Sequence, residues 1–289
     1  MPFAVSRAPW RLAPGGTAML VCATAAAAGA QTDFYNTDRG RPQQVEDATP
    51  VEWRAFELQA APLRLERGRG GAYQWGVEPE LAWGVLPRTQ IEVGLPLAWR
   101  DAPPTAGAGP AAGRRGGVAG IEVAALHQLN TESWTLPAFA VGASVLAPVG
   151  ALAPRSAYAT ATAIATRTFA WGRAHANAAF TAGPRAARGV GPVTAGPAAQ
   201  ELSRWLAGVA LDHTWAVRSL LAGVEAVARR PVDGGAVEWS AGTGARWQVS
   251  PRVAMDAGVG RRLTGDDQGW YVTAGSAYAF GLPRTFGGR

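Results

Sequence analysis

The residues that could act on a solute are charged side chains set within otherwise apolar, alternating segments. Acids dominate the first part of the chain, and arginines join them later. If these segments close into a barrel, acids on one wall face arginines on the other, and this transverse field can orient a polar solute. A salt-bridged lumen that only stabilises a closed barrel explains the pattern equally well. The candidate lumen-facing residues are Glu57, Glu78, Glu80, Glu92, Glu122, Arg167, Arg204, Glu225, Glu238, Arg246 and Asp256.

Catalysis would need a nucleophile beside a base, and the three histidines are the candidate bases. His127, His175 and His213 all fall toward the same predicted end of the barrel, without an obvious serine partner. No metal-ligand spacing such as HExxH occurs. The Asp266-Asp267 turn could hold a cation, although a hydrated turn explains it as well. We therefore expect no enzyme activity, no metal and no cofactor.

The elements that must position these charges are β-strands, most clearly in a hairpin over residues 72–100. In its first arm the apolar residues occupy odd positions, from Tyr73 to Trp83, and small or acidic residues occupy the even ones. A turn at 84–89 leads into a second arm with the same alternation, from Ile91 to Trp99. Side chains alternate faces along a strand, so each arm has one apolar face and one small or acidic face.

The same unit recurs to the end of the chain and gives about twelve strands of roughly ten residues, a length that crosses a bilayer at a tilt. Two prolines, Pro79 and Pro96, stand inside predicted strands. Because proline removes a ladder donor, we expect a bulge at one of them or a nearby strand boundary. The predicted strands besides the hairpin are residues 53–63, 118–129, 134–145, 158–169, 174–183, 204–211, 217–227, 237–247, 253–260 and 270–280.

Loop lengths and tryptophans indicate that the apolar face meets lipid. Short turns alternate with longer loops rich in Gly, Pro and Arg, as in outer-membrane barrels. Apart from Trp10 in the expected signal, the tryptophans stand near predicted strand ends, where an indole fits the membrane–water interface. Those expected at the short-turn rim are Trp53, Trp83, Trp134, Trp171, Trp215 and Trp247, and those at the long-loop rim are Trp75, Trp99, Trp205, Trp239 and Trp270.

A soluble barrel or sandwich would instead bury the apolar face. The other face carries mostly Gly, Ala, Ser, Thr and Gln with scattered charges, whereas a soluble exterior usually has denser charge. A lumen of modest width favours such small and polar groups.

The first residues resemble a secretory signal. Arg7 and Arg11 precede an apolar run, and Ala28-Gly29-Ala30 offers a cleavage site. No later apolar run is long enough for a membrane helix. We expect a signal peptide at 1–30, a loose periplasmic segment at 31–52, the barrel at 53–280 and a tail at 281–289.

The charge balance is basic without indicating nucleic acid. The formal charge is +6, and all basic residues are Arg. The arginines fall in Gly/Pro-rich loops rather than along a helix or a basic stripe with stacking aromatics. Guanidinium groups grip phosphates, so contact with lipopolysaccharide is one hypothesis, and plain solvated charge is the alternative. The residues concerned are Arg114, Arg115, Arg185, Arg188, Arg229, Arg230, Arg261 and Arg262.

Three short segments carry a family resemblance: Glu46-Asp47-Ala48, LPRTQIEVGLPL at 86–97 and Ala147-Pro148-Val149-Gly150. With them, the chain resembles the outer-membrane transporter family named for the meta-pathway of phenol degradation. The resemblance implies an exported barrel, a transport role with a poorly defined substrate, and no catalytic residues. Members tend to have Pro-Thr-Gly where this chain has Pro148-Val149-Gly150. The pattern at Val272–Phe280 resembles a barrel-assembly signal, yet further residues follow it.

Together these observations predict an all-β protein, a transmembrane antiparallel up-and-down β-barrel of about twelve strands in the bacterial outer membrane. The expected role is passage of small, aromatic or hydrophobic solutes. A plugged structural or adhesive barrel and a soluble periplasmic ligand-binding barrel are the alternatives. Expected partners are outer-membrane lipid, lipopolysaccharide, a small-molecule solute and the barrel-assembly machinery.

Overall fold

The computed structural model describes residue 37 and residues 39–67, 73–101, 114–184, 203–231, 234–265 and 268–281. These residues form strands joined by turns and loops. Among them there is no helix with the length and apolarity that crossing a membrane requires. The strands are β1 Ala55–Arg67, β2 Tyr73–Val77, β3 Glu80–Leu86, β4 Thr89–Gly94, β5 Leu97–Asp101, β6 Arg114–Val118, β7 Ile121–Asn130, β8 Ala138–Ala147, β9 Tyr158–Phe169, β10 Gly172–Ala182, β11 Ser203–Thr214, β12 Leu220–Pro231, β13 Glu238–Ser250, β14 Val253–Arg262 and β15 Trp270–Gly281.

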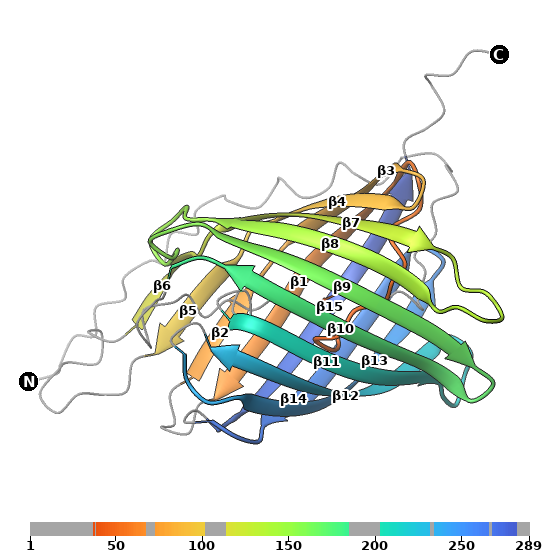
Figure 1. Cartoon of the computed structure of the whole chain (residues 1–289). Helices are drawn as coiled ribbons and strands as arrows, with labels where there is room; N and C mark the ends of the chain where they lie inside the picture. The colour runs from red at the N-terminus through yellow and green to blue at the C-terminus, as the bar shows by residue number, and fades with distance from the viewer. Residues whose placement is uncertain are drawn as a thin grey trace, which may run out of the picture.

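The sheet closes on itself because the last strand pairs with the first. β15 runs antiparallel to β1 along almost its whole length, from Ala55 opposite Gly281 to Arg67 opposite Trp270. Every other strand pairs antiparallel with its neighbours. Figure 1 shows the resulting tilted barrel. Since β2 with β3, β4 with β5, and β6 with β7 are each one interrupted strand, the barrel has twelve strands, and the predicted fold is confirmed.

The three interruptions lie beside one another. Pro79 separates β2 from β3, and Pro96 separates β4 from β5. Ala119 and Gly120 separate β6 from β7, and the N–H of Ala119 donates to the carbonyl of Pro96 at 2.8 Å. β1 shifts register between Ala60 and Leu63 at the same level. The missing proline donors thus break the ladder at both prolines, whereas a single bulge or boundary was expected.

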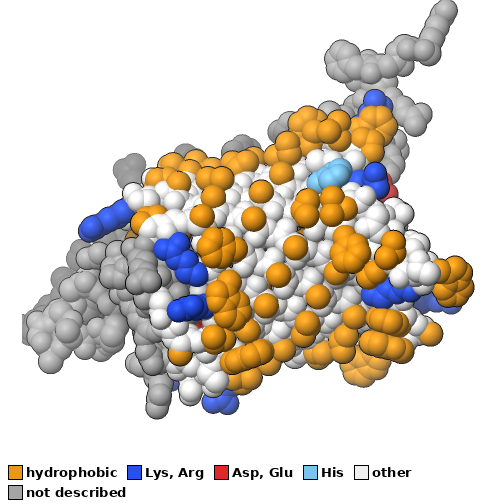
Figure 2. Space-filling model, viewed as in Figure 1, with side chains coloured by type: hydrophobic (Ala, Val, Ile, Leu, Met, Phe, Trp, Pro, Cys, Tyr) orange, Lys and Arg blue, Asp and Glu red, His pale blue; other side chains and the backbone are white. Residues whose placement is uncertain are grey.

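The outward face is apolar and the inward face is polar. Val93 is 50 % exposed and Val209 is 58 % exposed, whereas Glu78 is 2 % exposed. Figure 2 shows hydrophobic side chains across one outer face, with larger groups toward both ends and small ones between. A wall of this kind suits lipid tails, because a soluble barrel would bury its apolar face.

Turns and loops alternate in length, as the sequence predicts. One end, here called the short-turn end, carries the connections at 87–88, 131–137, 170–171, 215–219 and 251–252. The opposite end, the long-loop end, carries those that include 102–113 and 183–202. The eleven tryptophans among the described residues lie at strand ends or in the adjoining turns of these two rims, all half-buried or exposed. Trp75 and Trp99 stack on each other at the long-loop end, with ring centroids 4.4 Å apart.

The lumen contains a segment of the chain itself. Residues 39–52, here called the strap, lie inside the barrel, and most of their side chains are buried. In Figure 1 the strap is the red-orange segment seen between the strands. The sequence instead predicts a loose segment here, because the strap has no hydrophobic period. The predicted signal at 1–30 and the tail beyond residue 281 lie outside the described residues.

Because the apolar face of the wall points outward, the energetic cost of a charged substitution on it is expected to depend on the depth of that position in the bilayer. Val209 lies in the middle of β11 and faces outward, whereas Val217 lies in a short turn at the rim. In a bilayer, Val209→Arg is expected to destabilise the barrel by about 2–4 kcal/mol, and Val217→Arg by about 1 kcal/mol or less. Urea unfolding in lipid vesicles measures both. Equal costs at the two positions would contradict a membrane-facing wall.

Candidate functional site

The candidate site is the lumen, where side chains of the wall bind the backbone of the strap. Five strap N–H groups, those of Gln44, Val45, Glu46, Ala48 and Val51, donate to side-chain oxygens of the wall. The acceptors come from β12, β10, β9 and β4. Buried peptide groups must be paired, so this arrangement replaces the water that the strap would otherwise bind.

Glu225 is the most heavily used acceptor. Its Oε2 accepts the N–H groups of Gln44, at 2.6 Å, and Val45, at 3.1 Å. Its Oε1 accepts the Tyr271 hydroxyl at 3.1 Å and the Gln44 amide at 3.2 Å. Three of these four hydrogen bonds come from the strap, so Glu225 is one of the strap's main attachments to the wall.

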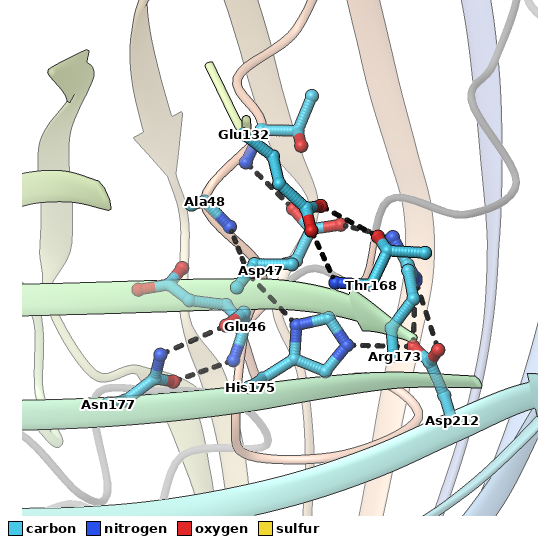
Figure 3. A network of polar contacts seen from close by, with 11 residues as sticks. Glu46, Asp47, Ala48, Glu132, Thr168, Arg173, His175, Asn177 and Asp212 are labelled. Carbon is cyan, nitrogen blue, oxygen red and sulfur yellow. Dashed lines mark hydrogen bonds and ion pairs between the residues drawn. The ribbon is translucent and has the colours of Figure 1, made fainter. Parts of the chain in front are cut away.

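Asn177 binds the strap as a second peptide strand would. Its Oδ1 accepts the Glu46 N–H at 2.7 Å, and its Nδ2 donates to the Glu46 carbonyl at 2.9 Å. Figure 3 shows this pair, with the neighbouring contacts made by β9, β10 and β11.

Inward-facing glycines make room for the strap. An added Cβ at Gly258 would lie 2.3 Å from the Pro42 carbonyl oxygen, and one at Gly244 would lie 2.5 Å from the Pro42 Cβ. At Gly208 it would lie 2.7 Å from Val45. Because real Cβ atoms do not approach this closely, these glycines form a seat that larger residues would fill.

Ion pairs tie the strap to several sides of the barrel. Arg39 pairs with Glu122 of β7 and Arg41 with Asp256 of β14, each at 3.0 Å. β7 and β14 lie on nearly opposite sides of the ring, so the strap crosses the lumen. Asp47 of the strap forms an ion pair with Arg173 of β10, with 3.3 Å between the Asp47 Oδ2 and the Arg173 Nη1.

A threonine, a histidine and an aspartate form a chain of hydrogen bonds next to the strap, and Figure 3 labels the histidine and the aspartate. The Thr166 hydroxyl lies 3.0 Å from Nδ1 of His175, and Nε2 of His175 lies 2.9 Å from Asp212. The sequence predicted no serine partner for this histidine, and its contact with Thr166 was not predicted either. The Thr166 oxygen already accepts the Ala48 N–H at 3.0 Å, so this hydroxyl holds the strap.

The long-loop end of the lumen holds a separate arginine cluster. Glu66 accepts hydrogen bonds from Arg64 and Arg262. The Arg64 guanidinium lies over the Tyr271 ring, 4.0 Å from its centroid. Arg229 donates to the side-chain oxygen of Gln44, which connects the cluster to the strap.

Most of the predicted lumen residues lie on the inward side of the wall. Arg246 of β13 approaches Glu57 of β1 at 3.7 Å. Glu80, Glu92, Arg204 and Glu238 are half-buried. The fully buried members are Glu57, Glu78, Glu122, Glu225, Arg246 and Asp256.

Arg167 is the exception, and its lumen placement was wrong. It shares the outward side of β9 with Ala161 and Ala163, while Thr166 faces inward. Its guanidinium donates to the carbonyls of Ser133 and Trp134 and pairs with Glu132. Because successive side chains of a strand point to opposite faces, an error of one position in the strand puts a side chain on the wrong face.

Two arginines assigned to outer loops face the lumen instead. Arg229 and Arg262 lie inside β12 and β14, which extend beyond the predicted ends at residues 227 and 260. Side chains alternate faces along a strand, so the same alternation that places Glu225 and Asp256 inward also places Arg229 and Arg262 inward. The sequence pattern therefore contained the information needed to predict both positions. Their neighbours Arg230 and Arg261 are exposed. Arg185 and Arg188 lie outside the described residues, as do the side chains of Arg114 and Arg115.

The other two histidines lie at exposed positions. His127 Nδ1 lies 2.9 Å from the Thr89 hydroxyl at an exposed position, and His213 is exposed. Within the described ranges no group of three or more His, Cys, Asp or Glu could hold a metal ion. The Asp266-Asp267 turn lies outside those ranges.

Comparisons with known proteins give the fold. No protein-family model matches the sequence, and the comparison with curated proteins found no match. An outer-membrane channel from Pseudomonas putida F1 matches with a TM-score of 0.51 and 10% identity, over 81% of this chain and 98% of that one. The KdgM porin matches with a TM-score of 0.46 and 10% identity, over 78% and 99%. The match to the Pseudomonas putida channel shows the fold of an outer-membrane barrel, and the meta-pathway family stays a prediction.

The glycine seat predicts that one methyl group displaces the strap. In Gly258→Ala, the methyl overlaps the Pro42 carbonyl, and overpacking of this kind costs about 1–3 kcal/mol. Trypsin is expected to cleave after Arg39 faster in the folded variant than in the parent chain. Gly142→Ala is the matched control, because its Cβ would have only ordinary contacts, the nearest at 3.5 Å. Equal cleavage rates in the two variants would contradict the seat.

The buried ion pair makes a second prediction. Arg41→Gln removes the charged partner of Asp256 and is expected to cost about 1.5–3 kcal/mol of unfolding free energy. The cost stays below that of a fully orphaned charge because Arg246 lies opposite Asp256 in the β13–β14 ladder. Arg218→Gln, at an exposed turn position, is expected to change stability by less than about 0.5 kcal/mol.

Urea unfolding followed by tryptophan fluorescence measures both variants. Adding Asp256→Asn to Arg41→Gln is expected to recover part of the loss, because it removes the buried charge. A strap that adds nothing to stability would make Arg41→Gln indistinguishable from Arg218→Gln.

Proposed function

We propose that the protein is a passive outer-membrane channel for small hydrophilic solutes, with the strap as its constriction. The observation that carries the proposal is the chemistry of the lumen. Its wall presents carboxylates, guanidiniums and amides, and it holds the strap by hydrogen bonds and ion pairs rather than by a continuous apolar core. Polar contacts of this kind can exchange with water and solute.

The lining favours hydrophilic solutes over the aromatic or hydrophobic ones that the sequence suggested. An apolar solute in the place of the strap would leave the carboxylates of Glu225 and Asp256 without the donors that the strap supplies, which costs several kcal/mol. The inward apolar patches are small, and the strap contributes to them: Ala48 packs with Leu126 and Ile164, and Val45 packs with Val227.

The second candidate is a plugged structural barrel, and the contacts of the strap across the lumen favour this candidate. The contacts from Arg39 to Glu122 and from Arg41 to Asp256 span the lumen. In this candidate the strap stays seated and nothing passes.

The location and partners of the channel belong to the same proposal. Bilayer lipid would meet the apolar wall, and Arg230 and Arg261 are two of the exposed arginines at the long-loop end that could meet lipopolysaccharide phosphates. Insertion by the barrel-assembly machinery and export through an N-terminal signal complete the proposed route.

Planar-bilayer recording separates the two candidates. The full chain is expected to give discrete current steps, and Gly258→Ala is expected to give larger steps because its strap is displaced. Gly142→Ala should match the parent chain. Silence from both the parent chain and Gly258→Ala, with folded barrels confirmed by heat-modifiable migration, would overturn the channel and leave the plugged barrel.

A further inference from the structure

A hollow opens on the outer side of the wall, toward the short-turn end. Its volume is about 570 Å³, and its exposed lining is almost entirely apolar. Among the described residues that line it there is none of the strap. The hollow therefore lies on the face that meets lipid tails and not in the lumen. Outward-facing side chains that line it include Ala165, Arg167, Ala174, Ala176, Val209 and Leu211.

Alanines at neighbouring positions produce the hollow. Ala176 of β10 is the cross-strand partner of Ala165 on β9, and Ala174 faces the same way two positions along β10. The larger side chains of Val209 and Leu211 stand beside them on β11, 58 % and 45 % exposed. Figure 2 shows small hydrophobic side chains over the middle of this outer face, with larger ones toward its ends.

Neither water nor empty space suits a hollow of this kind. Its apolar lining offers water few hydrogen-bond partners. An empty hollow forfeits the dispersion contacts that filling atoms would make. A hydrocarbon chain from the surrounding bilayer can fill it, because such a chain is both apolar and flexible. Small-molecule sites have volumes of about 300–1,000 Å³ and mostly apolar linings with a few polar groups, so the hollow has room for part of a lipid.

A guanidinium group lies at the edge of the hollow nearest the rim. Arg167 donates from Nη1 to the Ser133 carbonyl at 2.6 Å and from Nη2 to the Trp134 carbonyl at 2.7 Å. Its Nε lies 3.5 Å from a carboxylate oxygen of Glu132. Each Nη atom carries a second N–H group. The side chain is 26 % exposed, so a phosphate oxygen can reach these groups.

The order of these groups along the wall matches the order of groups in a phospholipid. Arg167 stands two positions before Phe169, the last residue of β9. The ring of Phe169 stacks on Trp171 in the adjoining turn, with centroids 5.1 Å apart. Aromatic residues at such rims mark the level of the lipid headgroups. The hollow extends from there toward the middle of the bilayer, past Ala165, where acyl chains lie.

We propose that the hollow and Arg167 form a binding site for one phospholipid, with an acyl chain over the alanines and the phosphate on the guanidinium. A second barrel is the less suitable occupant, because a stable protein interface needs about 800 Å² from each partner and the hollow covers only neighbouring positions of β9–β12. The site deepens the proposed bilayer location of the barrel and needs no conduction.

The chain offers a matched control for each part of the site. Ala176 and Ala178 are both exposed, outward-facing alanines of β10, and of the two only Ala176 lines the hollow. Ala176→Phe and Ala178→Phe therefore add the same ring to the same face. Arg167→Gln and Arg218→Gln remove the same charge at the same end of the barrel, and Arg218 lies in an exposed turn.

Native mass spectrometry of the full chain, folded in detergent and titrated with dioleoylphosphatidylglycerol, tests the site. The parent chain is expected to retain one phospholipid saturably. Ala176→Phe is expected to lose it because the added ring fills the hollow, whereas Ala178→Phe retains it. Arg167→Gln is expected to weaken retention by about tenfold, because it removes charge-assisted hydrogen bonds, whereas Arg218→Gln behaves as the parent chain. Heat-modifiable migration confirms that every variant tested is folded.

Four results would overturn the site. They are no saturable retention by the parent chain, equal retention by the two phenylalanine variants, equal retention by the two glutamine variants, and equal retention of dioleoylglycerol, which lacks the phosphate. A dimer of the parent chain that Ala176→Phe dissociates would assign the hollow to a second copy and overturn the lipid site as well.

Two further measurements keep this site distinct from the proposed function. Flotation with vesicles of the same phospholipid reports bilayer insertion, and planar-bilayer recording reports conduction. Barrels that insert or conduct without retaining a phospholipid in detergent would refute the site alone. Retention of one phospholipid together with a silent bilayer would support the site and refute the channel.

Discussion

The structure depends on the rule that peptide groups and charges inside a barrel must have partners. Outside, the strands meet that rule by pairing all round the ring, which is why the sheet closes between β1 and β15. Inside, the strap brings unpaired peptide groups into a narrow space. The wall supplies acceptors for these groups through Glu225, Asn177 and Thr166, whose side-chain oxygens take the place of a neighbouring strand.

The strap also explains why many side chains on the inward face of the barrel are so small. An empty lumen could be filled by larger side chains, as in small barrels packed by their own residues. Here Gly208, Gly244 and Gly258 leave the space, and Pro42 and Val45 occupy it. Glycine weakens a strand, so its repeated use at the strap contacts is a cost that the packing of the strap offsets.

The sequence predicted the barrel because alternation with a period of two is a local signal. It placed Tyr158–Phe169 with the same bounds as the structure and set the outward face correctly at Val93 and Val209. The strap has no period, and its partners are far away in the chain: Arg41 and Asp256 are 215 positions apart. Long-range pairing of this kind leaves no local pattern. Arg229 and Arg262 were misplaced only because their strands were drawn too short.

Gln44 connects the two parts of the lumen. Its backbone N–H and amide group bind Glu225, and its side-chain oxygen accepts from Arg229. A group that replaces this oxygen on Arg229 removes one of the contacts that hold the strap. A displacement of the strap that carries Gln44 away from Arg229 also frees Arg229 for another acceptor, and an acceptor that takes Arg229 favours the same displacement, because linked equilibria are reciprocal. Through this hydrogen bond, Gln44 couples the long-loop end of the lumen to the seating of the strap.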